Sequence, residues 1–283
     1  MKKLKSIFIS SYCTYLPVVM VWAMMDYLQT GSQAMALVAV LHGVGGGFFG
    51  WLFLRPQART TALLPKWTIS TIILAVAASY LAFTEANFVA GIFVATAWLG
   101  WSLYLFWYSS FGGQKNKALS VGKPLPDFTL FTPSGETVSR EDLSTKPTLM
   151  IFYRGNWCPL CVAQVKEIAG MYQTLADMGV EVCLVSPQPE KNTQQLADRF
   201  KVPFKFLVDK DLKAAQAFGI KVDGGTPTGL EALGYDSDTV RPTILITNGE
   251  GKLIYSDMTD NYRVRPEPEE FIKVFEAELQ LAS

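Results

Sequence analysis

Histidine is almost absent from this sequence, because His42 is the only one among 283 residues. Its scarcity excludes a multi-histidine metal centre and most catalysis that depends on histidine. Cysteine is scarce too, since the four residues at positions 13, 158, 161 and 183 are too few for a disulfide-stapled scaffold. Neither half has a dense cluster of lysine and arginine interleaved with aromatic residues, so we expect no nucleic-acid partner.

Charged side chains are missing from long stretches of the first half. The whole chain is 18% charged, against about 25% in typical soluble domains. Residues 1–118 hold eight basic and two acidic residues, a net charge of +6, whereas residues 119–283 hold seventeen and twenty-three, a net charge of −6. We therefore expect a transmembrane domain over 1–117 and a soluble domain over 118–283, with a short linker at 118–126.

Four uncharged stretches in the first half are each long enough for the ~20 residues of a membrane-spanning helix. We place the spans at about 7–28, 33–54, 67–84 and 87–109. The first contains Pro17 and ends near Asp26, so its limits are the least defined. Buried helices of a soluble core are the weaker interpretation, because four such runs follow one another with few charges between them. A cleaved signal peptide is also weaker, because no clear small-x-small site closes the first run.

The basic residues of the first half lie in every second loop. They are Lys2, Lys3 and Lys5 at the N-terminus, Arg55, Arg59 and Lys66 in the middle loop, and Lys115, Lys117 and Lys123 after the fourth span. The loops around 26–33 and 84–87 contain no lysine or arginine. The positive-inside rule therefore predicts an integral protein of the inner or plasma membrane, if bacterial, with a cytoplasmic soluble domain.

The second predicted span is rich in glycine. Gly43 with Gly47, and Gly46 with Gly50, form small-xxx-small pairs that let helices approach closely. We interpret this pattern as packing within a helical bundle. A quinone or proton site at His42 is the alternative, since an ionisable residue within a membrane is a functional candidate.

The second half shows alternating strand and helix patterns, which predict an α/β domain with a layered sheet. Expected strands lie at 128–131, 147–153, 180–186, 205–208, 243–247 and 252–256, and expected helices at 159–178, 190–200, 210–218 and 267–281. The segment 248–251 reads Asn-Gly-Glu-Gly between two strands and predicts a hairpin. Since a hairpin joins antiparallel strands, the sheet should be mixed. Residues 221–240 are rich in glycine and are expected to form a loop insertion.

The chemistry of this half centres on two cysteines in the string Phe-Tyr-Arg-Gly-Asn-Trp-Cys158-Pro-Leu-Cys161. Pro159 suits the first turn of a helix, so Cys158 is expected at a helix N-terminus, where the dipole favours a thiolate. Arg154 adds positive charge nearby. Cys161, one turn further along the helix, could attack a mixed disulfide or a sulfenate at Cys158. Together they would form a reversible dithiol/disulfide couple.

Zinc binding, haem attachment and a purely structural role have less support for the Cys-x-x-Cys pair. A zinc site needs further ligands, and neither Cys13, Cys183 nor His42 is placed to supply them. Haem attachment requires histidine after the second cysteine, where this chain has Val162. A purely structural pair remains open. We therefore expect no metal and no other cofactor, and we interpret Cys183 as a core residue.

Residues 119–283 resemble the thioredoxin-like superfamily, and within it the alkyl hydroperoxide reductase/thiol-specific antioxidant (peroxiredoxin-like) branch. The matching segments are 122–128, 152–161, 185–188, 209–213, 217–219 and 241–243. The resemblance implies that Pro242 is a cis-proline beside the reactive cysteine, and that Arg241 orients peroxide and lowers the thiol pKa. Gly155 stands where peroxiredoxins place a threonine or serine that hydrogen-bonds peroxide.

The resulting hypothesis is a membrane-anchored, peroxiredoxin-like thiol peroxidase. Its expected catalytic residues are Cys158, Cys161, Arg154 and Arg241, and its expected substrate-binding residues are Trp157, Pro159, Pro242 and Gly155. A thioredoxin- or glutathione-type system would supply the reductant, and the lipid bilayer is the expected environment of the first half. Two alternatives stay open: a thiol–disulfide oxidoreductase acting on protein partners, and a membrane-tethered redox sensor.

Overall fold

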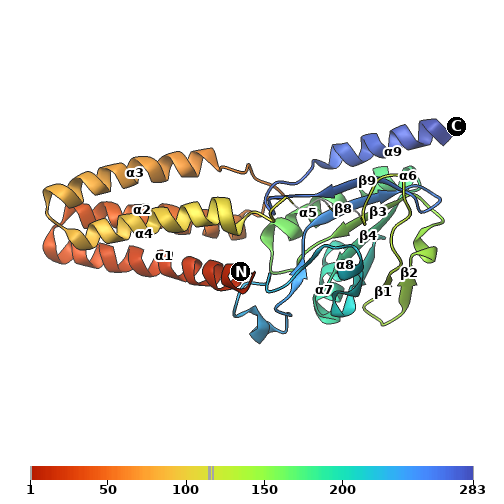
Figure 1. The fold of residues 1–283 in the computed structure, drawn as a ribbon, viewed down its shortest axis with the longest axis horizontal. Helices are drawn as coiled ribbons and strands as arrows, with labels where there is room; N and C mark the ends of the chain where they lie inside the picture. The colour runs from red at the N-terminus through yellow and green to blue at the C-terminus, as the bar shows by residue number, and fades with distance from the viewer. Residues whose placement is uncertain (1, 114–115, 117, 283) are drawn as a thin grey trace. The chain divides into compact units, whose positions relative to one another are not determined.

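A computed structural model describes residues 2–113, 116 and 118–282 (Figure 1). Lys115, Lys117 and the expected domain boundary after residue 117 lie outside the described residues. The chain divides into two compact units by its internal contacts. One unit consists of Leu4–Pro56 and Thr60–Ser110, and the other contains the chain from Phe111 onward together with short pieces around residues 2–3 and 57–59.

The first unit consists of four long helices. They are α1 (Lys2–Thr30), α2 (Gln33–Leu54), α3 (Pro65–Thr84) and α4 (Phe88–Ser102), and α4 continues into a π-helical turn at Leu103–Tyr108. All four are long and apolar enough to cross a membrane. Pro17 lies inside α1 without ending it.

Side-chain size differs between the buried and the exposed face of α3. Ala75, Ala78 and Ala82 of α3 are buried in the shared core, whereas large apolar side chains such as Ile73 and Phe83 on the same helix are exposed. Small residues inside let helices pack closely, and large apolar residues outside suit lipid. The expected membrane bundle therefore agrees with the distribution of side chains.

Glycine contributes to this packing at two of the expected positions, since an added Cβ would lie 3.2 Å from Met20 at Gly43 and 3.7 Å from Leu16 at Gly46, and at two further positions. A Cβ added at Gly100 would lie 2.2 Å from the Tyr12 ring, and one at Gly45 would lie 3.1 Å from Leu16. A Cβ at Gly47 or Gly50 would have no neighbour within 4 Å. The small-xxx-small prediction is therefore wrong for those two positions, because they lie on a part of α2 that no other helix approaches closely.

Polar groups in the bundle are paired locally. The carboxylate of Glu85, after α3, accepts hydrogen bonds from the hydroxyl of Ser32 at 2.6 Å and from the N–H of Ala34 at 3.1 Å. It thereby joins the two loops that contain no lysine or arginine. His42 is buried, and its Nδ1 donates to the Val38 carbonyl at 2.8 Å. This bond gives the histidine a structural role in α2.

The second unit is built on a mixed sheet. Its strands are β1 (Thr129–Phe131), β2 (Thr137–Ser139), β3 (Thr148–Phe152), β4 (Glu181–Ser186), β5 (Lys205–Val208), β8 (Thr243–Thr247) and β9 (Leu253–Met258). The spatial order is β2-β1-β5-β4-β3-β8-β9. β3, β4 and β5 run parallel, and the other pairs are antiparallel. The mixed α/β fold and the hairpin at 248–251 are thus confirmed.

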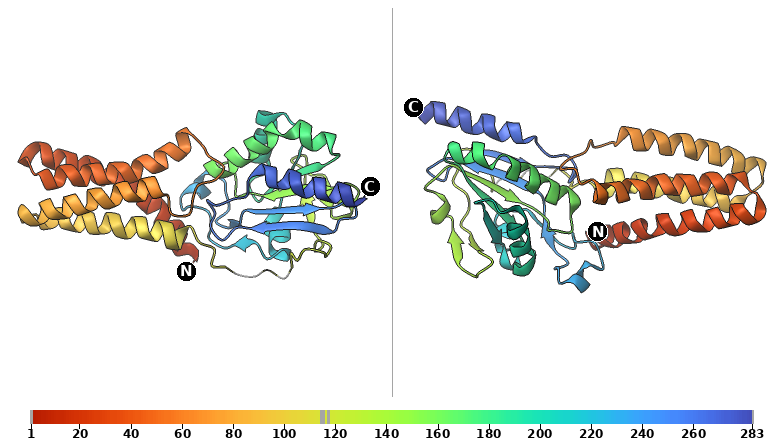
Figure 2. Two further views of the ribbon diagram at one scale, coloured as in Figure 1. Left: turned by 90° about the horizontal axis from the view of Figure 1, so that it is seen from above. Right: turned by 180° about the vertical axis from the view of Figure 1, so that it is seen from behind.

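The helices of this unit are α5 (Pro159–Gly170), α6 (Tyr172–Asp177), α7 (Glu190–Phe200), α8 (Lys213–Ala217) and α9 (Pro268–Ala282). The expected helix over 159–178 is interrupted at Met171, which has non-helical dihedral angles. α9 lies over the last strands (Figure 2), and its Phe271 contacts Tyr255 of β9 at a centroid distance of 6.2 Å.

The expected loop at 221–240 contains more structure than its glycines suggested. β6 (Lys221–Val222) and β7 (Thr239–Val240) pair as a small antiparallel sheet, and a 3-10 turn at Leu230–Leu233 lies between them. Two-residue strands are too short to produce a period-two signal, which explains why the sequence pattern missed them. β2, with three residues, was missed for the same reason.

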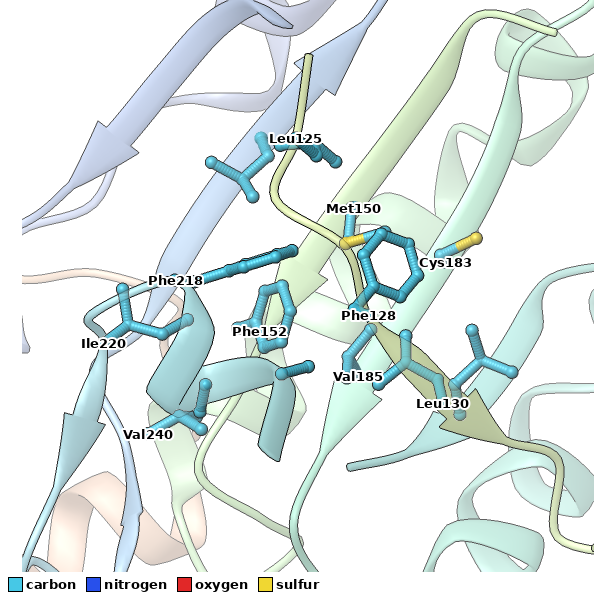
Figure 3. Packing of buried hydrophobic residues seen from close by; sticks show 14 of the residues in the cluster. Leu125, Phe128, Leu130, Met150, Phe152, Cys183, Val185, Phe218, Ile220 and Val240 are labelled. Atoms are coloured by element: carbon cyan, nitrogen blue, oxygen red, sulfur yellow. The ribbon is translucent and has the colours of Figure 1, made fainter. Parts of the chain in front are cut away.

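The core of the second unit gathers around three phenylalanines (Figure 3). The ring centroid of Phe218 lies 5.4 Å from that of Phe152 and 5.6 Å from that of Phe128. Met150 and Phe152 share one face of β3 because side chains alternate along a strand. Cys183 is fully buried in the same cluster, so its assignment to the core is confirmed.

Replacing Phe218 by alanine should destabilise the second unit by about 3–5 kcal/mol, because it leaves a cavity between two aromatic rings. Urea unfolding of the full chain in detergent micelles, followed by circular dichroism, measures the change. Leu233→Ala is the control, since Leu233 is 68% exposed and should change stability by less than about 0.5 kcal/mol. Equal effects of both substitutions would contradict the assigned core.

Candidate active site

The two cysteines lie where β3 passes into α5. The chain follows β4 for one residue beyond β3, since the N–H of Tyr153 donates to the Val185 carbonyl at 2.9 Å. It then turns, and the N–H of Cys158 donates to the Gly155 carbonyl at 3.1 Å. Cys158 is the N-cap of α5, and its carbonyl accepts the N–H of Cys161 at 3.0 Å. Because Cys158 and Cys161 are one helical turn apart, their side chains lie next to each other on the same face of α5.

Gly155 shapes the turn before the cysteines. Its φ of +146° lies in a region that L side chains rarely adopt, and an added Cβ would lie 2.9 Å from the Trp157 indole. Gly155, which the sequence predicts to bind substrate, is therefore required by the conformation of the loop. Because glycine has no side chain, the Trp157 indole packs directly against its backbone. Within the loop, Asn156 and Trp157 are partly exposed, as is Pro159 at the start of α5, whereas Cys158 is buried.

Gln188, which follows β4, fixes the loop between β3 and Cys158 by hydrogen bonds from its side-chain amide. Its Oε1 accepts the N–H of Asn156 at 2.8 Å, and its Nε2 donates to the Tyr153 hydroxyl at 3.0 Å. The side chain is 2% exposed. Buried, fully used amide groups of this kind fix a single backbone conformation. The sequence pattern included Gln188 in a matching segment and assigned it no role.

The two thiol groups are buried and hydrogen-bonded to each other, with 2% of Cys158 and 0% of Cys161 exposed. The guanidinium Nη2 of Arg265 donates to Cys161 Sγ at 3.3 Å. Burial opposes ionisation of Cys161, but the bond from Cys158 and the charge and hydrogen bond of Arg265 together hold its pKa well below the usual range. Burial, followed by the interaction with Cys161, raises the pKa of the Cys158 thiol.

Interactions beyond the helix N-terminus also bear on which sulfur carries the negative charge. The helix N-terminus alone favoured a thiolate at Cys158. The tertiary structure adds a direct cationic donor to Cys161, together with a hydrogen bond from the backbone N–H of Arg154. A charge-assisted hydrogen bond lowers the pKa of the group that accepts it, so these contacts favour ionisation within the Cys158/Cys161 pair.

Arg154 lies beside the cysteines as expected. Its guanidinium is 4.6 Å from the Trp157 ring centroid and 5.5 Å from that of Tyr262, and it donates to the Gly225 carbonyl. Its positive charge also favours ionisation of Cys158, although more weakly than burial opposes it. Arg154 and Trp157 therefore form a stacked pair at the entrance of α5.

Arg241 is placed differently from the expectation. Its guanidinium donates to the carbonyls of Met258 at 2.7 Å and Thr259 at 2.8 Å, and to the Asp260 carboxylate at 2.6 Å. These bonds direct it to the end of β9 and the segment that follows, and none of its hydrogen bonds within the described residues goes to a cysteine. Arg265, which the sequence pattern missed, supplies the guanidinium at the sulfur.

Pro242 is buried, but the expected cis bond is not found. The described part of the chain contains no cis peptide bond. Arg241 donates its N–H to the Ile220 carbonyl at 2.8 Å, and its own carbonyl accepts the Thr243 hydroxyl at 3.0 Å. These two bonds fix the backbone on either side of Pro242, just before β8 begins.

A third group joins the site through Arg265. Gln164, one turn after Cys161 on α5, accepts a hydrogen bond from Nη1 of Arg265 at 2.6 Å, and Arg265 Nε donates to the Tyr262 carbonyl at 3.2 Å. Sequence reasoning missed both residues, because Arg265 lies in an irregular segment before α9 with no motif. Nothing in the local sequence distinguishes it from Arg263, two residues earlier.

Comparisons with known proteins identify relatives of the second unit. Residues 121–256 match the AhpC/TSA family. Peroxiredoxin bcp of Coxiella burnetii is 31% identical over 106 residues, which cover 38% of this chain and 70% of that protein. Thiol-disulfide oxidoreductase ResA of Halalkalibacterium halodurans is 29% identical over 115 residues, or 40% of this chain and 64% of that protein.

A solved structure shows the fold alone. Peroxiredoxin 6 of Arenicola marina superposes with a TM-score of 0.50 and 14% identity, over 58% of this chain and 75% of that chain. The family match likewise concerns the second unit, since it begins after the helical bundle and ends before α9.

Replacing Gly155 by alanine should destabilise the protein by about 1–3 kcal/mol through backbone strain, and further through the clash with Trp157. Gly135→Ala is the matched control, because Gly135 also has a positive φ, +93°, but an added Cβ there meets nothing within 4 Å. Thermal unfolding of both variants measures the difference. The role assigned to the Trp157 contact is wrong if the two variants lose equal stability.

Proposed function

This chain belongs to the AhpC/TSA family of thioredoxin-like proteins, and we propose that it is a membrane-anchored thiol peroxidase that uses the Cys158/Cys161 couple. Membership makes it a thiol-dependent oxidoreductase. The observation that carries the finer proposal is the pair of hydrogen-bonded thiols beside two buried guanidinium groups, those of Arg154 and Arg265. Such an environment favours a thiolate at neutral pH.

The proposed reaction uses both sulfur atoms in turn. The thiolate forms a bond to one peroxide oxygen, the O–O bond breaks, and the leaving oxygen takes up a proton to give an alcohol or water. The sulfur becomes a sulfenic acid, having lost two electrons to the peroxide. The second thiol attacks this sulfenic acid, expels water and leaves a disulfide. A dithiol reductant of thioredoxin or glutathione type then restores both thiols.

Burial of the two thiols supports a small substrate. With only 2% of Cys158 and 0% of Cys161 exposed, a hydroperoxide reaches the sulfur more readily than a protein disulfide, which would need local opening. The same burial limits attack by bulky cellular thiols.

Disulfide exchange with a protein partner is the second candidate. Two observations favour it: the similarity to a thiol-disulfide oxidoreductase, and Gly155 in place of a hydroxyl residue. The partly exposed Trp157 and Pro159 would then form part of the docking surface for that partner.

The four apolar helices support anchoring in a membrane, and the loop charges support a cytoplasmic second unit. In that compartment thiols are kept reduced, so a dithiol enzyme would find its reductant there. The bilayer would also hold the site close to lipid hydroperoxides.

The pre-reduced full-length protein in detergent micelles should consume hydrogen peroxide and cumene hydroperoxide faster than free cysteine does. Complete ionisation alone provides roughly 30-fold at pH 7 over an ordinary thiol. Peroxide consumption, followed with a thioredoxin system and NADPH, measures the rate. Cys158→Ser and Cys161→Ser should both lose turnover, whereas Cys13→Ser, in α1, should keep it. Oxidation no faster than free cysteine would favour the disulfide-exchange candidate.

Reporter fusions at the C-terminus test the orientation. A fluorescent protein should fluoresce there, whereas alkaline phosphatase should stay inactive because its disulfides do not form in the cytoplasm. Active phosphatase together with a dark fluorescent protein would place the second unit on the opposite, oxidising side and would reject the predicted topology.

A further inference from the structure

Arg265 is a buried cation next to the second cysteine of the pair. Its side chain is 6% exposed and lies in the segment between β9 and α9. Its hydrogen bonds go to the sulfur of Cys161 at 3.3 Å, the amide oxygen of Gln164 at 2.6 Å and the carbonyl of Tyr262 at 3.2 Å. Among the described residues, no aspartate or glutamate oxygen lies within 4.0 Å of its guanidinium. The Cys161 sulfur is therefore the hydrogen-bond partner of Arg265 that can take up a negative charge.

Gln164 orients this guanidinium although its own amide is only partly bonded. The side chain is 2% exposed, and its oxygen accepts a hydrogen bond from Arg265, but its Nε2 has no hydrogen-bond partner among the described residues. A buried donor without an acceptor costs about 1–3 kcal/mol. A residue that served stability alone would have both ends of its amide paired. Gln164 instead lies one helical turn after Cys161, where its oxygen directs Arg265 toward that sulfur.

The two cysteines share these surroundings only while both are thiols. In the proposed reaction Cys158, at the helix N-terminus, attacks the peroxide and becomes a sulfenic acid. Its sulfur is then bonded to oxygen, so Cys161 is the remaining thiol of the pair. Cys161 has to lose its proton before it attacks, because the thiolate is the nucleophile. The contact with Arg265 therefore bears on the second step of the reaction.

Other titratable groups near Cys161 supply little charge of their own. Burial opposes ionisation of this thiol, whereas the charge and hydrogen bond of Arg265 and the backbone N–H of Arg154 lower its pKa. Burial holds the pKa of the Tyr153 phenol above its usual range, so this phenol stays neutral. From β9, Asp257 lies in the field of Arg265, but burial raises the pKa of that carboxyl and weakens it as a competing anion.

We propose that Arg265, oriented by Gln164, stabilises the Cys161 thiolate once Cys158 is oxidised, and thereby speeds both closure and later opening of the disulfide. This inference rests on the proposed peroxidase function and keeps Cys158 as the residue that attacks the peroxide. Arg265 is then a catalytic residue, because it contacts a reacting sulfur, and Gln164 is a positioning residue.

In both steps the Cys161 sulfur carries a negative charge. During closure it bonds to the Cys158 sulfur, the S–O bond of the sulfenic acid breaks, and the departing hydroxide takes a proton and leaves as water. During reduction a thiolate of the external dithiol attacks Cys158, the S–S bond breaks, and Cys161 leaves with the electron pair as a thiolate beside Arg265. The second thiol of the reductant then displaces Cys158, so the dithiol supplies both electrons.

A chromogenic disulfide tests this role without peroxide. Pre-reduced, full-length protein in detergent micelles is mixed with one equivalent of dithiodipyridine, and the absorbance of the released thiopyridone is followed by stopped flow. Cys158 releases the first thiopyridone as it forms a mixed disulfide, and Cys161 releases the second as it closes the disulfide. The Cys158→Ser/Cys161→Ser protein gives the baseline from the other cysteines.

Arg265→Met should slow the second release about tenfold at neutral pH and move the midpoint of its pH profile upward by about one unit or more. The first release should slow less, because the hydrogen bond of Arg265 goes to the other sulfur. Arg199→Met, which removes an exposed arginine of α7, is the matched control and should change neither release. An unchanged second release in a folded Arg265→Met protein, or equal slowing of both releases, would overturn the proposal.

Gln164→Glu tests the same interaction with the buried hydrogen bond kept. The new carboxylate would pair with Arg265 and repel a nearby thiolate, so the second release should again move to higher pH. Gln195→Glu, at an exposed position of α7, is its matched control. Thermal unfolding shows whether each variant is folded, and Gln164→Glu decides the question if Arg265→Met is not. A second release with the wild-type rate and pH profile in Gln164→Glu would contradict the proposal.

Hydrogen peroxide separates failure of this proposal from failure of the proposed function. Under peroxide, Arg265→Met should hold the Cys158 sulfenic acid about tenfold longer than the wild-type protein, measured as a dimedone adduct by mass spectrometry. A wild-type protein with an Arg265-dependent second release that consumes no peroxide would reject the peroxidase function and keep the role of Arg265. Normal peroxide consumption with a second release independent of Arg265 would do the reverse.

Discussion

The contact between a buried guanidinium and a buried sulfur is the constraint on which the second unit depends. Arg265 and Cys161 are 104 residues apart in the chain, yet 3.3 Å separates their polar atoms. A guanidinium enters a protein interior only where an anion and oriented acceptors compensate for lost water. The reactivity of the dithiol therefore depends on the packing of the segment between β9 and α9 against α5.

The rest of the site serves to keep that contact rigid. β3 lies between β4 and β8 in the middle of the sheet, so the loop that leaves it starts from a fixed point. Gln188 binds the loop from β4, and Gly155 lets the Trp157 indole pack against its backbone. Arg154 stacks on the same indole. Preorganised groups of this kind hold a reactive sulfur in one geometry without further cost during the reaction.

The first unit has the composition of helices whose surroundings are lipid rather than water. Its helices bury alanine and glycine together with a few large side chains such as Phe48 and Trp101, and they expose isoleucine and phenylalanine. Helices in a bilayer gain little from hiding apolar side chains, so close packing of small residues decides which faces meet. Polar groups such as Glu85 and His42 are correspondingly bonded to nearby loops or to their own helix. Anchoring in a bilayer accounts for this composition.

Features that depend on neighbouring residues could be read from the sequence. Hydropathy located the four apolar helices, alternation located the longer strands, and Pro159 after Cys158 located the strand–helix junction that carries the dithiol. Local patterns determine such elements because each residue contributes through its own surroundings along the chain. The surroundings of the dithiol, by contrast, include Arg265, Gln164 and Gln188, which come from three separate parts of the chain. Arg241 fitted the family pattern and still faces the segment after β9. Charge compensation inside a protein is a property of three-dimensional neighbours, so only the folded chain decides which sulfur is ionised.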